Sequence, residues 1–394
     1  YRKSVLLARM QEMKPVGPGE YLVGLAVSTL MFAFVLSATY LLIKIFNLVV
    51  AGLTRWIWEP LAAAVALAVV VFVIYLVAHE VVFKGLMAVF ARKAFALNTT
   101  SAHGYPQPQV PERSGAPASL VPWEQIGGQG RKFICKGPSA QMIEDVTGEP
   151  ALEPIRIYAG MPRQNADLEA VADLAVADLE RAGGFDRSVL LVNTATGSGW
   201  VDEWLVQPME YLSRGDCAVV TMQYSYLFSA ALLVSDLEVC AVAGELLFRK
   251  IEERLQALPP HRRPLLIASG ESLGAYGSQA AFLDGRDLQQ RVDGAIWTGS
   301  PQASKLLREF TQARHRGSPQ IAPVYDNGLH IRFVNEPSQL QADLSGRELG
   351  RWEFPRAVFV QHASDPVVWY DTRLMIEKPD WIGESAGLDV LPMR

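Results

Sequence analysis

Residues 265–274 read Leu-Leu-Ile-Ala-Ser-Gly-Glu-Ser-Leu-Gly, and this stretch is the strongest indication of the fold class. The first five residues have the length and apolar composition of a buried β-strand. The pattern Gly270-Glu271-Ser272-Leu273-Gly274 follows at once, and a helical pattern begins at Ala275. A strand, a tight turn and a helix are the context that a G-x-S-x-G nucleophile elbow requires, because its glycines let backbones approach closely. The sequence therefore predicts Ser272 as a nucleophile, and the alternative is a structural Gly-Ser turn.

Apolar, β-rich runs alternate with helical patterns on both sides of this elbow. Candidate strands cover residues 155–159, 189–193, 218–223, 265–269, 295–298, 331–334 and 357–361. Candidate helices cover residues 165–181, 204–213, 236–257, 275–283 and 303–311. Strands that are separated by helices predict an α/β fold with a mostly parallel sheet and helices on both faces. In such a sheet the active site lies at the carboxyl ends of the strands.

The loop after residues 189–193 reads Thr194-Ala195-Thr196-Gly197-Ser198-Gly199. We expect main-chain groups of Thr196, Gly197 and Ser198 to form an oxyanion hole with the N–H of Leu273, the residue after the nucleophile. The glycines allow the backbone to turn its N–H groups inward. A phosphate loop is disfavoured because no Gly-Lys-Ser/Thr follows. A loop without a function is the remaining alternative.

A third loop follows residues 357–361 and carries His362 and Asp365. An aspartate just past a late strand is predicted to be the acid of a catalytic triad, which orients a histidine. The usual order along the chain is nucleophile, acid, histidine, yet no histidine follows Asp365 before Arg394. Three explanations stay open. The histidine lies in a C-terminal stretch beyond residue 394, His362 serves as the base, or the domain is catalytically inactive.

The N-terminal quarter of the chain is the most apolar part. Hydrophobic residues make up 50% of the 394 residues, and the excess lies before residue 97. Residues 21–43 and 61–78 are two uncharged runs, each long enough to cross a hydrocarbon core of about 30 Å. We therefore expect two transmembrane helices within residues 1–97. Residues 46–58, which connect them, are expected to form a helix that lies at the membrane–water interface. The proline-rich residues 98–121 are expected to form a linker or an extended strap.

Charge gives the expected orientation and partners. Basic residues flank the pair of runs more densely than they occupy the segment between them: Arg2, Lys3, Arg9 and Lys14 before, Lys84, Arg92 and Lys93 after, Lys44 and Arg55 between. The positive-inside rule then places the large C-terminal domain in the cytoplasm. With a net charge of −5 and no basic stripe, nucleic acid is not an expected partner. Three widely spaced cysteines favour neither disulfides nor a metal site, and we expect no cofactor.

Several longer motifs together resemble a known family. They are Leu120-Val121-Pro122-Trp123, residues 196–202, Met222-Gln223-Tyr224-Ser225-Tyr226, the elbow, and residues 364–369. Over nearly the whole chain, the sequence resembles bacterial membrane-bound α/β-hydrolases with a multi-spanning N-terminal domain. The resemblance implies an α/β-hydrolase domain over residues 122–394, a place in the bacterial inner membrane and further spans upstream. It also implies a Gly-His-Gly-His segment downstream that would supply the missing histidine, but it identifies no substrate.

Two functions follow as hypotheses. The first is a membrane-anchored serine hydrolase or acyltransferase, in which Ser272 forms an acyl-enzyme and Asp365 orients the base. Its substrate would be a lipid-like ester drawn from the bilayer, so membrane lipids are the expected partners. The second is a membrane protein whose inactive hydrolase-like domain serves interaction or assembly. Small residues in the second run, such as Ala62-Ala63-Ala64, also permit a homo-oligomer.

Overall fold

The computed structural model describes residues 17–76, 80, 84–100, 104–163, 166–362, 365–369, 371–375 and 379. The chain divides into two compact units, Tyr1–Ala88 and Val89–Arg394. The α-helices are α2 (Pro18–Leu53), α3 (Glu59–Leu76), α4 (Lys84–Thr100), α5 (Gly128–Cys135), α6 (Ala140–Thr147), α7 (Leu168–Arg181), α8 (Glu203–Leu212), α9 (Ser229–Ser235), α10 (Glu238–Gln256), α11 (Leu273–Ala280), α12 (Gly285–Arg291), α13 (Lys305–Gln312) and α14 (Pro366–Trp369). The strands are β1 (Ile155–Ala159), β2 (Val189–Thr194), β3 (Cys217–Met222), β4 (Leu265–Glu271), β5 (Gly294–Thr298), β6 (Ile331–Val334) and β7 (Arg356–Val360).

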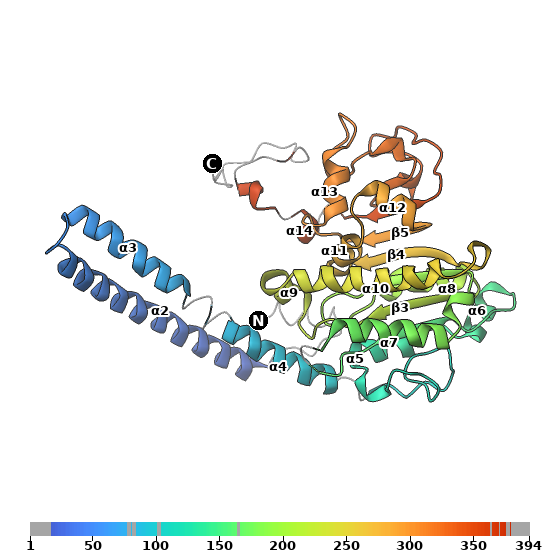
Figure 1. Cartoon of the computed structure of the whole chain (residues 1–394), viewed down its shortest axis with the longest axis horizontal. Helices are drawn as coiled ribbons and strands as arrows, with labels where there is room; N and C mark the ends of the chain where they lie inside the picture. Colours follow the sequence, from blue (N-terminus) through green and yellow to red (C-terminus); the bar gives the residue numbers. More distant parts are fainter. Residues whose placement is uncertain are drawn as a thin grey trace. The chain divides into compact units, whose positions relative to one another are not determined.

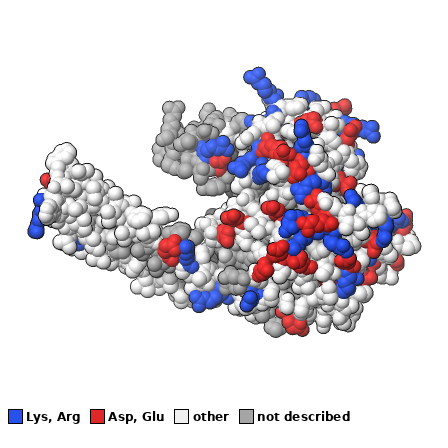
Figure 2. Space-filling view, viewed as in Figure 1, with Lys and Arg blue, Asp and Glu red and all other residues white. Residues whose placement is uncertain are grey.

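The N-terminal unit contains two apolar helices, α2 and α3, that contact each other. Both are long and apolar enough to cross a membrane, with mean hydropathies of 2.1 and 2.3. Their surface carries few charges, whereas the surface of the C-terminal unit is densely charged (Figure 2). Ala62 and Ala66 of α3 are fully buried, which is consistent with small residues allowing two helices to approach closely.

Helix α2 is longer than the sequence led us to expect. It has 36 residues and continues without a break to Leu53, so the first part of the segment expected to lie in the interface prolongs the helix instead. The physical reason is that residues 44–51 contain neither glycine nor proline, and nothing stops a helix that has already begun. A turn over residues 54–57 then separates α2 from α3.

A seven-stranded sheet in the order β1-β3-β2-β4-β5-β7-β6 organises the C-terminal unit. Every neighbouring pair is parallel, as the alternation of strands and helices predicted. The register pairs Thr194 with Gly270 and Glu271 with Thr298. The carboxyl ends of β2, β4 and β5 therefore lie side by side, and they bring the loops that follow these strands together.

Helices lie on both faces of this sheet (Figure 1). Helices α7, α10, α11 and α13 share one hydrophobic core with the sheet, and we call this side the covered face. Helices α5 and α8 share a second core with β1, β2 and β3 on the other side, which we call the half-open face. Among the described residues, no helix covers the half-open face of β5 or β7.

Residues 104–121 form a packed strap and not a flexible tether. The Ser114 hydroxyl donates a hydrogen bond of 2.7 Å to Asp178 of α7, and the Leu120 N–H donates one of 2.8 Å to the same carboxylate. Arg181 forms an ion pair of 2.7 Å with Asp178, whose side chain is fully buried. A buried carboxylate is stable when it is paired and hydrogen-bonded in this way, and the strap is thereby fixed to α7.

Candidate active site

Ser272 lies between the end of β4 and the start of α11. Its backbone has φ 51° and ψ −118°, a region that residues other than glycine rarely adopt. The Ser272 N–H donates a hydrogen bond of 2.9 Å to the Thr298 carbonyl at the end of β5, which holds the turn in place. Such strain, maintained by neighbouring strands, is characteristic of a nucleophile elbow and leaves the serine partly exposed.

The two glycines of the elbow are required by close backbone contacts. A Cβ on Gly270 would lie 2.4 Å from the carbonyl carbon of Gly274. A Cβ on Gly274 would lie 2.2 Å from the Thr194 oxygen, at the end of β2. Larger residues would therefore push α11 away from the sheet. Leu273 is the first residue of α11, so its N–H has no carbonyl partner within the helix and remains a donor near Ser272.

The predicted oxyanion loop turns at the carboxyl end of β2, against the start of α11. Thr196 N–H bonds to the Trp200 carbonyl at 2.9 Å, and Gly197 N–H bonds to the Tyr224 hydroxyl at 3.1 Å. Gly197 and Gly199 have φ values of 55° and 94°, which other residues would adopt only with strain. Ser198 lies between these two glycines and is half-buried.

Asp365 lies at the same edge of the sheet as Ser272. A Cβ built on Gly299 would be 3.6 Å from an Asp365 carboxylate oxygen, and Gly299 directly follows the strand residue that binds Ser272. The other carboxylate oxygen accepts a hydrogen bond of 2.9 Å from the Val367 N–H. The Asp365 N–H donates to the His362 carbonyl at 3.0 Å. The structure thus brings the predicted nucleophile and the predicted acid to one end of the sheet.

The histidines that flank strands lie at opposite ends of the sheet. His362 follows the carboxyl end of β7 and its side chain is exposed. His261 precedes β4 and His330 precedes β6, so both lie toward the amino ends, away from Ser272. His79 and His103 lie outside the described residues. His315 follows α13. Of the three described histidines that flank strands, His362 is the one at the carboxyl end of its strand, where Ser272 and Asp365 also lie.

Two carboxyl groups beside the elbow had no part in the interpretation of the sequence. Burial, the nearby Asp202 carboxylate and Asp365 raise the pKa of Glu271 to about 7. Burial also raises the pKa of Asp202, which caps the start of α8 by accepting from the Trp204 N–H at 3.1 Å. Glu271 and Asp202 therefore lie close enough to interact, and Glu271 is the group whose protonated form is favoured by this closeness. The only signal in the sequence was an acidic residue directly before Ser272.

A parallel sheet with a strained serine between β4 and α11 and an aspartate after β7 defines an α/β protein with a hydrolase-type site. Comparison with family profiles agrees with this class. A profile described as "Alpha/beta-hydrolase family" matches residues 155–394, and one described as "Alpha/beta-hydrolase family N-terminus" matches residues 4–138. The chain belongs to the α/β-hydrolase family.

The chain also matches parts of two solved structures at low sequence identity. A Trichoderma reesei cutinase in complex with a phosphonate inhibitor is 14% identical, with 51% of this chain and 75% of the cutinase covered and a TM-score of 0.25. An acetylxylan esterase is 12% identical, with 46% and 84% covered and a TM-score of 0.28. No curated protein matches the chain significantly.

Proposed function

We propose that the protein is a membrane-anchored serine hydrolase of esterase type, or an acyltransferase, with Ser272 as its nucleophile. The observation that carries this proposal is the strained backbone of Ser272 between β4 and α11. A serine held at positive φ by a strand and a helix costs free energy, on the order of 1–3 kcal/mol, that a merely structural turn could avoid. Membership of the α/β-hydrolase family supports the same chemistry.

In the proposed first step, the Ser272 oxygen attacks the carbonyl carbon of an ester while its proton passes to a histidine. A C–O bond forms, and the π pair of the carbonyl moves to oxygen, which gives a tetrahedral oxyanion. The Leu273 N–H and main-chain donors of the 196–198 loop are the proposed stabilisers of that charge. The C–O bond to the leaving alcohol then breaks, and the histidine returns the proton to the alkoxide.

The acyl-enzyme left on Ser272 is consumed by the reverse sequence. Water, or an acceptor alcohol in the case of transfer, gives its proton to the histidine as it attacks the acyl carbon. The new tetrahedral oxyanion collapses, the bond to Ser272 breaks, and the serine regains the proton. Asp365 is the proposed acid, which orients the histidine and stabilises its cation. His362 and a histidine outside the described residues are the two candidates for the base.

The proposed anchoring rests on helices α2 and α3, whose apolar side chains are exposed over most of their length. An exposed apolar surface of that extent requires an apolar solvent or partner. We propose that this solvent is the bacterial inner membrane, with the hydrolase domain in the cytoplasm. A lipid-like ester is the corresponding substrate class, because an anchored enzyme meets bilayer lipids at high local concentration. Further assembly into a homo-oligomer is compatible with this anchoring.

The test is labelling of the full-length protein in its native membrane with a fluorophosphonate probe. We expect wild type to label and Ser272→Ala to fail, while Ser213→Ala, at the other end of the sheet, labels as wild type. If His362→Gln also fails, His362 is the base. If it labels normally, the base lies outside the described residues. An unlabelled wild type would overturn the catalytic proposal and favour a domain used for interaction or assembly.

A further inference from the structure

Not every main-chain N–H group in the loop after β2 donates a hydrogen bond. Thr196 N–H bonds to the Trp200 carbonyl, Gly197 N–H to the Tyr224 hydroxyl, and Gly199 N–H to the Thr196 carbonyl at 3.2 Å. Within the described residues 166–362, Ser198 N–H has no hydrogen-bond partner. A buried or half-buried N–H without a partner is uncommon in native proteins. The loop that carries this N–H leaves the carboxyl end of β2, where the Thr194 carbonyl lies against Gly274 of α11, so the Ser198 N–H is a donor that the fold leaves available at this end of the sheet.

A short chain of buried polar groups connects this loop to the elbow helix. The Tyr224 hydroxyl accepts from Gly197 N–H at 3.1 Å. The Cys240 sulfur lies 3.2 Å from the Tyr224 hydroxyl and 2.8 Å from the Leu273 carbonyl oxygen. The side chains of Tyr224 and Cys240 are 3% and 0% exposed. These contacts connect Gly197 of the loop to Leu273 of α11, and the loop and Leu273 are the two predicted sources of oxyanion donors.

The direction of the hydrogen bonds along this path follows from the donor inventory. A carbonyl oxygen only accepts and a thiol has a single hydrogen, so Cys240 donates to the Leu273 carbonyl. The thiol sulfur then accepts from the Tyr224 O–H, and the Tyr224 oxygen accepts from Gly197 N–H. Every hydrogen in the path has one acceptor, and each of the three bonds orients the next.

We propose that Tyr224 and Cys240 are positioning residues that hold the two parts of the oxyanion hole at a fixed separation and leave Ser198 N–H as the donor from the loop. This inference rests on the proposed serine-hydrolase function. It assigns Gly197, one of the residues expected to be a donor, to anchoring the loop. Ser198 and Leu273 then supply the donors on the two sides of the oxyanion.

Two further buried side chains fix the carbonyls of the same loop. Gln223 donates through its amide to the Ser198 carbonyl at 3.0 Å, and the Tyr158 hydroxyl donates to the Gly199 carbonyl at 3.0 Å. A Cβ on Gly199 would lie 2.0 Å from that hydroxyl. The loop is therefore constrained on both sides of Ser198, as preorganised stabilisation of an oxyanion requires.

The path keeps its protons through the physiological range of pH. Burial raises the pKa of the Cys240 thiol to about 11 and raises the pKa of Tyr224 well above its ordinary value. Both groups therefore stay neutral and hydrogen-bonded through the neutral range of pH. Neither Tyr224 nor Cys240 should contribute a step to the pH profile of kcat in that range.

The first experiment removes the N–H of Ser198. Ser198→Pro lacks this donor, whereas Ser198→Ala keeps it and loses only the hydroxyl. In full-length protein with a p-nitrophenyl ester, we expect kcat to fall about 10²–10³-fold in Ser198→Pro and to fall by a much smaller factor in Ser198→Ala. Equal kcat values in the two variants would overturn the assignment of the donor.

The second experiment keeps the inference testable if proline disrupts the loop. Tyr224→Phe and Cys240→Ala should lower kcat about tenfold to a hundredfold with KM unchanged, and Cys240→Ser, which can donate and accept, should recover most of the loss. Matched controls are Tyr226→Phe, whose hydroxyl bonds to Met161 instead, and Cys217→Ala, a buried cysteine at the start of β3. Both should keep the kcat of wild type.

Loss of kcat in the controls to the same extent would reveal a merely structural effect and overturn the inference, as would a change in KM alone. These outcomes differ from failure of the proposed function, in which wild-type protein is not labelled by the fluorophosphonate probe at all. Labelled wild type with unaffected Tyr224→Phe and Cys240→Ala variants would reject the positioning role and leave Ser272 in place as the nucleophile.

Discussion

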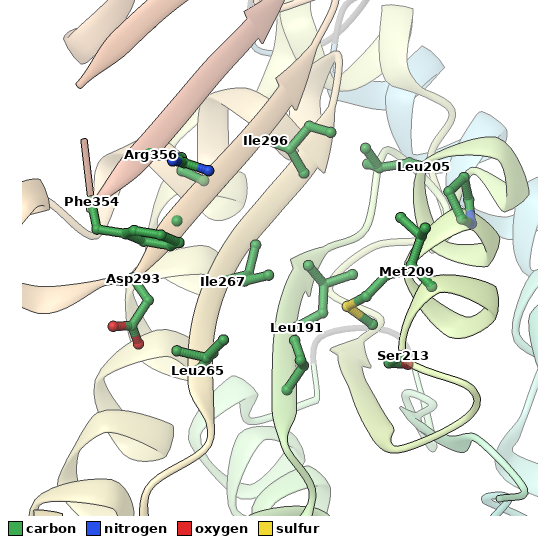
Figure 3. Close-up of a pocket in the computed structure, with 15 residues that line it drawn as sticks. Leu191, Leu205, Met209, Ser213, Leu265, Ile267, Asp293, Ile296, Phe354 and Arg356 are labelled. Carbon is green, nitrogen blue, oxygen red and sulfur yellow. The ribbon is translucent and has the colours of Figure 1, made fainter. Parts of the chain in front are cut away.

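The two halves of the sheet are packed differently. All residues of β1 and β3 are buried, and in β2 only the first residue is not, because helices cover both faces there. In β5 and β7 burial alternates: Ala295 and Trp297 are buried on the covered face, whereas Ile296 on the half-open face is not. A groove of about 470 Å³ lies over β4 and β5 beside α8, with Ile267, Ile296 and Met209 pointing into it (Figure 3).

The predicted components of the candidate site follow strands that differ in how they are packed. The oxyanion loop leaves β2, in the half packed on both faces, whereas Ser272 and Asp365 follow β4 and β7. Parallel strands are usually covered on both faces. Among the described residues β7, which precedes Asp365, is covered on one face only, whereas β4, which precedes Ser272, lies at the boundary, with Ile267 partly buried against the second core. The predicted acid therefore follows a less fully packed strand than the predicted nucleophile.

The largest effect is expected in the fully packed half. Arg156 of β1 and Glu210 of α8 form an ion pair of 2.6 Å with both side chains 0% exposed. Glu210→Ala leaves the guanidinium buried without its partner, so the free energy of unfolding should fall by about 3–5 kcal/mol. Urea unfolding of the detergent-solubilised protein measures it. The double variant Arg156→Met/Glu210→Leu should lose much less, and an equal loss would contradict this account.

Neighbours on β5 compare the two faces directly. Trp297 is 0% exposed and packs on Phe359 with ring centroids 5.0 Å apart, so Trp297→Ala should cost about 3–5 kcal/mol. Ile296 points into the groove and should cost about 1 kcal/mol when changed to alanine, because much of its side chain is not buried. Similar losses in the two variants would show that the faces are equally packed in the native protein.

The stability of the folded domain should depend on pH through Glu271, the last residue of β4. Its folded pKa of about 7 lies above the unfolded value, so the folded state binds the extra proton between these values and stability falls as pH rises through this window. Above about pH 7 the loss is complete, because both states are then ionised. Glu271→Gln should flatten this slope and raise the melting temperature relative to wild type at pH 8 but not at pH 4. A variant that follows the wild-type slope would exclude Glu271 as its cause.

The smallest effect is expected at the rim of the groove. Leu265 is 48% exposed, whereas its neighbour Leu266 is 5% exposed on the covered face. Leu265→Gln should change the free energy of unfolding by no more than about 0.5 kcal/mol, and Leu266→Gln should cost several times as much. A large loss for Leu265→Gln in full-length protein would mean that part of the native assembly covers the groove.

Local patterns were sufficient for most of the scaffold. The strands and the longer helices of the hydrolase domain were predicted within a few residues, because periodicity and the glycine pattern of the elbow are local. Short helices such as α5 and α12 were missed, since neither has a long amphipathic pattern, and each packs on an element distant in sequence or order: α5 on β1 and α12 on α13. The one-sided packing of β5 and β7 was also unpredictable, because apolar residues such as Ile296 and Trp297 occupy both faces of these strands alike.

The residues of the candidate site also differ in whether the local sequence could predict them. Ser272 and Asp365 were predicted from the residues around them, and their catalytic roles stay predictions. The contacts of Glu271 with Asp202 and of Tyr224 with Cys240 join segments far apart in the sequence, and no short pattern marks them. A tyrosine after a strand and a cysteine in a helix look like ordinary core residues until the fold brings them together.

The strap over residues 104–121 has a mechanical consequence. Ser114 and Leu120 bind Asp178 of α7, and the Ser114 N–H also donates a hydrogen bond of 3.0 Å to the Arg156 carbonyl of β1. Tension applied through the residues that precede the strap would therefore reach these hydrogen bonds, to α7 and to the edge strand β1, before it reached the central strands. Strand β4, which precedes Ser272, is separated from β1 by β3 and β2. Pulling the protein from its N-terminus should therefore disturb the strap and β1 before it changes the geometry of Ser272.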